Sequence, residues 1–442
     1  MHYARIEREL TVRSNPAYEQ LVIPNGNGGH PVHRWFRLKE AFSRDLLPQV
    51  VKDLGLVGKT ALRVVDPFAG SGTTAIAASQ LADTGVVGSA HVVGYECNPF
   101  LHLVASTKLR ALQEPTSSFL PLAQRVAAMA ARRRICAPPV PELATFATDC
   151  FFPEGHLDEL LRLGAAIDQS AADGAPRLDT DLARLCLGAT IETTSFLRRD
   201  GRALRYVPDK QPAQPVAEFL RRAEEIDSDL PSHPSRIKGG VRLGDGRRLA
   251  PEGPRTGTVD LVVFSPPYPN NIDYTEVYKM EAWLLGFISN QEQFSRQRLQ
   301  TVYSHPSILR TAESTLDVDP SLRCDFERLL EPVLEAVPVD RYRRSRAAML
   351  SGYFLDMLRT LQSSFRVLKP GGHLVYVVGN SVHGADGAYL VVAADILIAR
   401  LAVGAGFRVE SINVARRPHR RRVESQYLRE SVVFASKPER NG

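Results

Sequence analysis

Two short strings carry the residues whose types and spacing could do chemistry. Asp66 to Thr74 reads DPFAGSGTT, and Ser265 to Tyr268 reads SPPY. Gly70 and Gly72 can adopt backbone angles closed to other residues, so a ligand can approach the main chain there. The two prolines end their strand abruptly and hold polar groups rigidly at its carboxyl end. Because open α/β sheets bind ligands at that edge, we expect both strings to form one active site.

The elements on either side of the first string predict a site for a nucleotide-type cofactor. The run ALRVV before it is typical of a buried strand, and AIAASQLA after it favours a helix, so the glycines fall in a strand-to-helix turn. The next strand ends at Glu96, where a sheet of this kind binds ribose hydroxyls. The turn lacks the lysine of a phosphate-binding GxxxxGKS loop, which argues against a kinase or ATPase.

The order of elements predicts one α/β fold with insertions. VDLVVF precedes SPPY as a buried strand, and strands alternate with helices up to a terminal hairpin. We expect a mostly parallel sheet interrupted by helices. The expected regions are the N-terminal segment with the cofactor-binding half (1–109), a helical insertion (110–240), the catalytic half with SPPY (241–288), an irregular insertion (289–346) and the C-terminal half of the sheet (347–442).

Composition restricts the class of protein. The 442 residues are 44% hydrophobic, enough for a large core. No run of about 18 apolar residues exists and the N-terminus is charged, so we expect a soluble, cytoplasmic protein. Five scattered cysteines without a CxxC pair argue against a disulfide framework and a zinc site, and no metal is expected.

Basic clusters suggest a polyanionic partner. The formal net charge is +6, and arginines gather at 132–134, 341–346 and, most densely, 416–422. Each cluster could instead be a solvated helix end or loop, the favoured interpretation for the first. The densest one lies between the last two strands and could bind backbone phosphates through Arg416, Arg417, Arg420, Arg421 and Arg422. A further basic stretch, 195–210, could line a nucleic-acid groove through Arg198, Arg199, Arg202 and Arg205. Internal salt bridges to its aspartates are an equal alternative.

Together, DPFAGSGTT, GYECNPF and SPPY resemble the motifs of S-adenosylmethionine-dependent DNA methyltransferases that act on exocyclic amino groups. The resemblance runs from about His33 to Ser436 and includes VLKPGGHLVYVVGNS. It implies a Rossmann-like class I fold, with a mostly parallel seven-stranded sheet ending in an antiparallel hairpin, and S-adenosylmethionine as cofactor. Glu96 would bind the ribose and Asp245, in GDGRRL, would contact the adenine. The implied cofactor-binding residues are Asp66, Phe68, Ala69, Gly70, Gly72, Thr73, Glu96 and Asp245.

The same resemblance makes Ser265, Pro266, Pro267 and Tyr268 catalytic. An exocyclic nitrogen is a poor nucleophile because its lone pair is delocalised into the ring. The Ser265 hydroxyl and the Pro266 carbonyl would accept its hydrogens and draw it toward a tetrahedral form. Tyr268 would stack on a base extruded from the duplex, since the target atom cannot be reached inside it.

The resemblance leaves several choices open. The family most often places serine first for cytosine N4, but adenine N6 stays an alternative, as do an RNA base methyltransferase and a catalytically silent DNA-binding relative. Methylation of cytosine at carbon 5 is excluded. That reaction needs a cysteine nucleophile after a proline, and the sequence has no Pro-Cys pair. The helices of 110–240 and the segment 289–346 are joint candidates for reading the DNA sequence. A restriction or phage-defence protein is a candidate partner.

Two polar residues near the strings could have a role in the active site or only a structural role. Asp273 could orient the amine or cap a helix. Asn380 could line the site of the base or be only a turn residue. Tyr278 and Trp283 are expected in the core.

Overall fold

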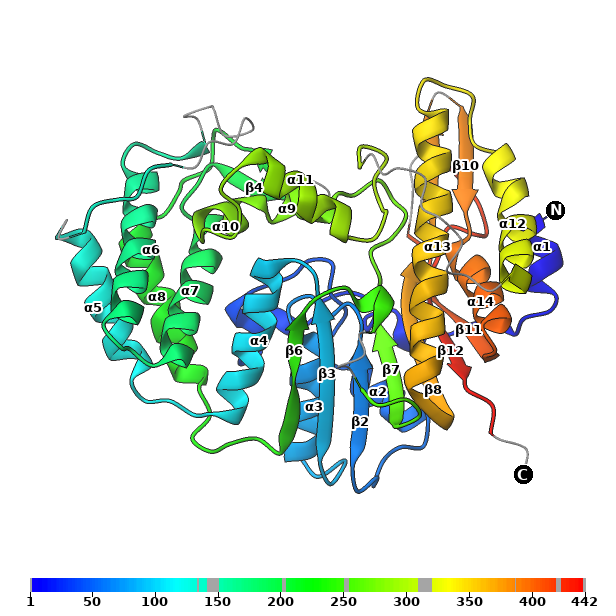
Figure 1. The fold of residues 1–442 in the computed structure, drawn as a ribbon, viewed down its shortest axis with the longest axis horizontal. Helices are drawn as coiled ribbons and strands as arrows, with labels where there is room; N and C mark the ends of the chain where they lie inside the picture. Colours follow the sequence, from blue (N-terminus) through cyan, green and yellow to red (C-terminus); the bar gives the residue numbers. More distant parts are fainter. Residues whose placement is uncertain are drawn as a thin grey trace.

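A central sheet of eight strands organises the computed structural model, which describes residues 2–132, 135–140, 151–200, 204–249, 254–308, 320–385, 387–418 and 423–439 (Figure 1). Five neighbouring strands run parallel to one another, whereas β12 runs antiparallel to both of its neighbours. In spatial order the strands are β1 (Val12–Ser14), β11 (Arg408–Arg416), β12 (Glu430–Ser436), β8 (Leu368–Gly379), β7 (Val259–Phe264), β2 (Leu62–Asp66), β3 (Ala90–Glu96) and β6 (Ile237–Leu243).

The sheet has one strand more than the seven expected. The three-residue β1 adds in parallel to β11, pairing Val12 with Ile412, and Arg13 Nε donates to Asn413 Oδ1 at 2.7 Å. A strand this short shows no alternation of apolar residues, so only its contact with β11 reveals it. The expected terminal antiparallel hairpin is present as β11 and β12.

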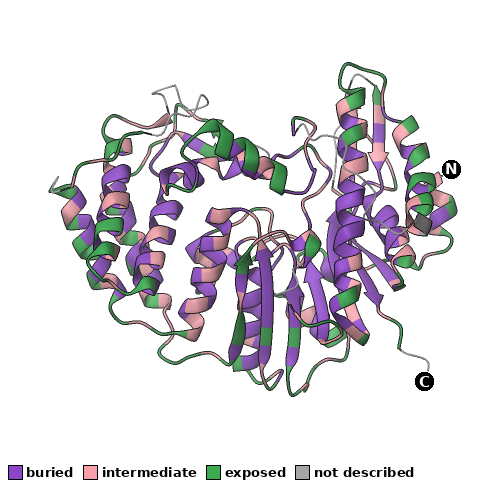
Figure 2. Cartoon of the chain, viewed as in Figure 1, coloured by how far each residue is buried: buried purple, intermediate pink, exposed green. Residues whose placement is uncertain are grey.

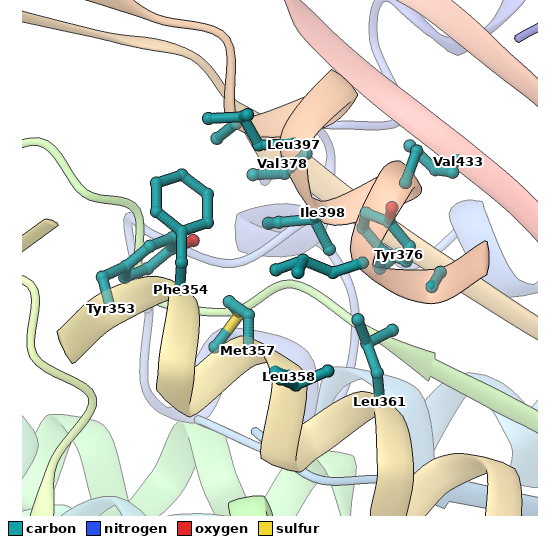
Figure 3. Packing of buried hydrophobic residues seen from close by; sticks show 14 of the residues in the cluster. Tyr353, Phe354, Met357, Leu358, Leu361, Tyr376, Val378, Leu397, Ile398 and Val433 are labelled. Carbon is teal, nitrogen blue, oxygen red and sulfur yellow. The ribbon is translucent and has the colours of Figure 1, made fainter. Parts of the chain in front are cut away.

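Helices cover both faces of the sheet, as a Rossmann-like fold requires. Along β7, Leu261 and Val263 pack into the core under α2 (Leu46–Asp53) and α3 (Thr73–Asp83), whereas Val262 and Phe264 pack into the opposite core. The central strands are therefore buried on both sides, whereas the edge strand β6 is largely exposed (Figure 2). In the second core, Tyr353 and Met357 of α13 (Arg343–Val367) approach Ile398 of α14 (Ala394–Gly404) and Tyr376 of β8 (Figure 3).

A bundle of helices lies beside the sheet, on the side of α4 (Pro99–Gln113). Its helices share a separate apolar core and pack on α4 through α7. They are α5 (Phe119–Ala131), α6 (His156–Ala172), α7 (Arg177–Ile191) and α8 (Pro215–Asp229), with the small hairpin of β4 (Leu197–Arg199) and β5 (Leu204–Tyr206).

The remaining elements lie near the ends of the chain or follow SPPY. They are α1 (His2–Glu7), α9 (Tyr274–Val277), α10 (Lys279–Leu284), α11 (Gln291–Gln300), α12 (Pro320–Glu335), β9 (Ser381–Ala385) and β10 (Ala388–Val392). The segment 289–346, expected to be irregular, thus contains α11 and α12. Among the described residues, no helix is both long and apolar enough to cross a membrane.

Candidate active site

A cavity of about 370 Å³ lies at the carboxyl ends of β2, β3 and β7, where both strings meet. All four residues of SPPY line it, as do most residues predicted to bind the cofactor: Asp66, Phe68, Ala69, Gly70, Thr73, Glu96 and Asp245. Gly72 does not line it. Arg416 does, whereas Arg417 does not, and Arg420, Arg421 and Arg422 lie outside the described residues.

Asp66 holds the glycine turn by hydrogen bonds to residues on either side of the two glycines. This buried carboxylate accepts from the Phe68 amide at 2.9 Å and from the Thr74 hydroxyl at 2.5 Å. Burial raises its pKa to about 6. Gly70 and Gly72 both have positive φ, 53° and 87°. The second glycine precedes α3, and a Cβ there would lie 3.2 Å from the Ala105 Cα of α4. Gly72 therefore permits helix packing rather than facing the ligand.

Glu96, at the end of β3, lines the cavity and links the turn after β2 to the residues that follow β3. Its Oε2 accepts from the Gly70 amide at 2.9 Å and its Oε1 from the Asn98 amide at 2.8 Å. Burial raises its pKa to about 7 against the opposing effect of these hydrogen bonds. A carboxylate has about four acceptor positions, so hydroxyl groups of a ligand can still bind.

Asp245 faces the cavity but is already paired. Arg247 donates to it through Nε at 2.8 Å and through Nη2 at 2.9 Å. The same guanidinium reaches Asp356 of α13 at 2.8 Å, a carboxylate 109 positions away. The turn also approaches the glycine turn so closely that a Cβ on Gly246 would lie 1.9 Å from the Pro67 carbonyl oxygen. Sequence reasoning missed Arg247 and Asp356 because no local pattern marks a pair this distant.

The SPPY string begins immediately after β7. Phe264 fixes the end of the strand between the rings of Phe68 and Tyr376, at centroid distances of 5.5 and 5.7 Å. Tyr268 donates its hydroxyl hydrogen to Glu430 Oε1 at 2.8 Å, and the Ser265 hydroxyl donates to the Tyr268 phenol oxygen at 3.4 Å. Burial and Glu430 raise the Tyr268 pKa well above its usual value. The phenol therefore stays protonated and can donate.

The other polar residues of this region have mainly structural roles. Asp273 caps α9, accepting from the Thr275 amide at 3.1 Å, and it pairs with Arg298 at 2.7 Å. The helix-cap interpretation is therefore confirmed. Asn380 donates to Asp395 at 2.7 Å and does not line the cavity. Tyr278 and Trp283 are buried as expected, although the Tyr278 ring also borders the cavity.

The arginines predicted to bind nucleic acid lie in different places, some near the cavity and some in the interior of the protein. Arg416 Nε pairs with Glu430 Oε2 at 2.5 Å, and Arg417 donates to the Gln426 carbonyl. Arg199 is buried between Glu192 and Glu281 over the ring of Tyr278, so this residue makes internal salt bridges and does not line a nucleic-acid groove. A guanidinium removed from water needs carboxylate partners of this kind to offset its lost hydration. Arg205 pairs with Asp200, and Arg202 lies outside the described residues.

Two sequence relatives cover most of the chain. The chain is 25% identical over 427 residues to the Type II methyltransferase M.AvaI of Nostoc sp. strain PCC 7120, covering 89% of this chain and 83% of the relative. It is 24% identical over 438 residues to the Type II methyltransferase M.BsoBI of Geobacillus stearothermophilus, covering 88% and 81%. Over most of its length the chain is thus similar to Type II methyltransferases. The expectations of a methyltransferase and of S-adenosylmethionine as its cofactor are thereby confirmed.

Solved structures resemble this methyltransferase only weakly. A DNA modification methylase of Thermus thermophilus complexed with S-adenosylmethionine is 19% identical, covers 44% of this chain and 54% of its own, and has a TM-score of 0.22. The rRNA methyltransferase AviRa of Streptomyces viridochromogenes is 11% identical, covers 99% and 93%, and has a TM-score of 0.27. No protein-family model matches the chain. The Rossmann-like character of the fold is seen in the mainly parallel sheet with helices on both faces.

Proposed function

We propose that this methyltransferase transfers the methyl group of S-adenosylmethionine to the exocyclic amino group of a DNA base, with cytosine N4 as the favoured acceptor. The single observation that carries the proposal is that SPPY and the glycine turn line one cavity at the carboxyl ends of β7 and β2. A methyl donor beside an amine acceptor needs only such an arrangement, because in-line transfer depends mostly on positioning. Adenine N6 is the alternative acceptor, since serine at the first position does not exclude it.

The residues around the cavity fit the cofactor. The glycine turn would hold the methionine end, with the Gly70 amide fixed by Glu96 at 2.9 Å. Glu96 would accept from ribose hydroxyls, and Asp245, with its orientation fixed by Arg247, would accept from the adenine amino group. S-adenosylmethionine, when bound, supplies an electrophilic methyl group.

The SPPY residues would prepare the acceptor. The Ser265 hydroxyl and the Pro266 carbonyl would accept the two amino hydrogens and so localise the nitrogen lone pair. Tyr268 would supply the aromatic surface on which the extruded base stacks. Both prolines limit the motion of these groups, which lowers the cost of orienting the base.

We further propose that the segment 289–346 contributes more to DNA recognition than the helices of 110–240. Among the described residues, Gln300, Thr301 and Val302 of the later segment line the cavity, whereas none of 110–240 does. In Figure 1, α11 and the N-terminal end of α13 also stand on opposite sides above the carboxyl ends of the strands. A restriction protein as partner stays a prediction.

Transfer of labelled methyl groups tests the proposal. The full chain and labelled S-adenosylmethionine are incubated separately with DNA from a host lacking methylases, with RNA and with protein. We expect label in DNA only, and nucleoside digestion should then yield N4-methylcytosine. N6-methyladenine would move the acceptor to adenine. Label that enters RNA or protein but never DNA would refute the proposal.

A further inference from the structure

Glu430 connects the tyrosine of SPPY to Arg416 at the end of β11. Tyr268 donates to its Oε1 at 2.8 Å, and Arg416 donates to its Oε2 at 2.5 Å. The Glu430 side chain is only 7% exposed, whereas that of Arg416 is 33% exposed. A nearly buried carboxylate thus has one partner in the active site and one at the rim of the cavity.

The direction of β12 explains how Glu430 reaches the site. Because β12 is antiparallel to β8 and β11, its first residue lies where those strands end, at the edge that carries the cavity. Glu430 is paired in register with Gly379 of β8 and with Arg416 of β11. Neither neighbour is close to Tyr268 in sequence. The antiparallel strand therefore delivers an acidic side chain to an edge otherwise built by parallel strands.

Gly379 provides the second restraint on the same ring. A Cβ at this position would lie 2.7 Å from Tyr268 Cε2 and 2.9 Å from Cδ2, closer than real carbon contacts. The ring therefore packs directly on the backbone of β8, and its hydroxyl is held by Glu430. Packing on one face and a hydrogen bond at the tip together fix both the position and the rotation of the ring.

We propose that Glu430 is a positioning residue of the base site. Its carboxylate, held by Arg416, fixes the Tyr268 ring through the phenol hydroxyl in the orientation that stacks on the target base. This inference rests on the proposed function. It gives Arg416 a role inside the site, different from the phosphate contact predicted from sequence. No proton is transferred, because Tyr268 remains the donor and Glu430 the acceptor throughout.

A double-mutant cycle on Tyr268 and Glu430 tests the proposal with the full chain. The single-turnover rate constant of methyl transfer to methylase-free DNA is measured for Tyr268→Phe, Glu430→Leu and the double variant. Each single change should lower it by about 10- to 100-fold, the range for a lost hydrogen bond to a charged group. The double variant should be no slower than the slower single variant, because both changes remove one interaction.

Conservative and matched variants separate positioning from folding. Glu430→Gln keeps an oxygen acceptor for the phenol, so its rate constant should stay within about threefold of the wild type. The dissociation constant of S-adenosylmethionine should change less than about twofold in every variant, since neither residue is proposed to touch the cofactor. Glu410→Leu, on β11, removes a carboxylate that pairs with exposed Arg408 and does not line the cavity, and its rate should equal that of the wild type.

Two results would overturn the inference. One is a fold-loss of the rate constant in the double variant that equals the product of the two single fold-losses, which would mean that Glu430 and Tyr268 act independently. The other is a single-turnover rate constant for Glu430→Leu that equals that of the wild type, when the wild-type chain does methylate DNA. Failure of the proposed function itself looks different: the wild-type chain would place no label in DNA, and this inference would fall with it.

Discussion

Two carboxyl groups hold the glycine turn in place. Glu96 accepts from the Gly70 and Asn98 amides, and Asp66 accepts from Phe68 and Thr74. Burial raises both pKa values, to about 7 for Glu96 and about 6 for Asp66. Because these values lie above those of the unfolded chain, the stability they give is complete at low pH and is lost as pH rises through them. The unliganded chain should therefore be more stable near pH 5 than near pH 8.

Cofactor affinity should have the opposite dependence on pH. Ionised Glu96 offers two acceptor oxygens to ribose hydroxyls, whereas protonation converts one of these oxygens into a donor. The dissociation constant of S-adenosylmethionine should therefore rise as pH falls below about 7. The increase approaches about tenfold per pH unit if only the ionised form binds. Isothermal titration between about pH 5.5 and 8.5 measures it. Glu96→Gln cannot ionise and should flatten the dependence, and an equally steep curve in that variant would assign the effect elsewhere.

Tyr268→Ala separates catalysis from cofactor binding. The side chain lines the cavity as part of SPPY, and its partners are Glu430 and the backbone of β8. Its removal should abolish transfer to DNA because the extruded base loses its stacking surface. The dissociation constant of S-adenosylmethionine, measured by equilibrium dialysis, should stay within about twofold. An equal loss of transfer and of cofactor binding would show that Tyr268 has been given the wrong role.

At the scale of elements, two of the turns that line the cavity contact each other. The turn after β6 brings Gly246 against the Pro67 carbonyl of the glycine turn. Gly246→Ala would place its Cβ 1.9 Å from that oxygen, so one turn must move. We expect cofactor binding to weaken at least tenfold and unfolding free energy to fall by about 1–3 kcal/mol. Calorimetric titration and urea unfolding measure the two effects.

Gly244→Ala is the matched control for Gly246→Ala. Gly244 lies in the same turn and also lines the cavity, but a Cβ there would meet only Tyr95 Cδ1 at 4.0 Å, an ordinary contact. Its cofactor affinity should stay near that of the wild type. If both variants lose affinity equally, the close approach of the two turns is not the cause.

The N-terminal end of α13 presents a charged tip suited to DNA phosphates. Arg341, Arg343 and Arg344 are exposed there, beside half-exposed Tyr342. Replacing the three arginines by alanine should weaken DNA binding. It should also reduce the slope of log Kd against log salt by up to about 2.7, the value for three phosphate contacts. Fluorescence anisotropy with duplex DNA at several salt concentrations measures both.

Three exposed arginines of the helical bundle provide the control for this tip. Arg125, Arg132 and Arg177 carry the same charge but lie on α5 and α7 or directly after α5. Their replacement should leave the salt slope nearly unchanged. An equal reduction in both triple variants would indicate a response to net charge, not contact with DNA at α13.

At the scale of the whole molecule, one buried carboxylate joins the two ends of the chain. Asp395 of α14 is fully buried and accepts from Arg429, Ser431 and Asn380 at 2.7–2.9 Å. Arg429 also pairs with Glu7 of α1 at 2.9 Å. These contacts fix α1 and the start of β12, the strand that carries Glu430.

Asp395→Ala should therefore destabilise the fold strongly. It leaves the guanidinium of Arg429 buried with only Glu7 as a charged partner, and the free energy of unfolding should fall by about 3–5 kcal/mol in urea. Glu292→Ala breaks an exposed pair with Arg296, whose side chains are 80% and 68% exposed, and should cost at most about 1 kcal/mol. Similar losses in both variants would contradict the assignment of Asp395 as a buried hub.

The sequence by itself predicted the glycine turn, the SPPY string at the end of a strand, and the alternation of strands with helices. These follow from local properties: positive φ at Gly70 and Gly72, the strand end set by Pro266 and Pro267, and the periodicity of apolar residues. The family resemblance, which the sequence relatives confirm, depends on the same strings.

Only the tertiary structure decided which partners complete the site. Tyr268 and Glu430 are 162 positions apart, Arg247 and Asp356 are 109 apart, and Arg199 meets Glu281 inside the protein. The eighth strand likewise exists only through its pairing with β11. No local pattern encodes such contacts, because burial and strand direction bring distant residues together only after the sheet has formed. For the same reason, the sequence showed Arg416 as a surface charge, and the fold made it the partner of Glu430.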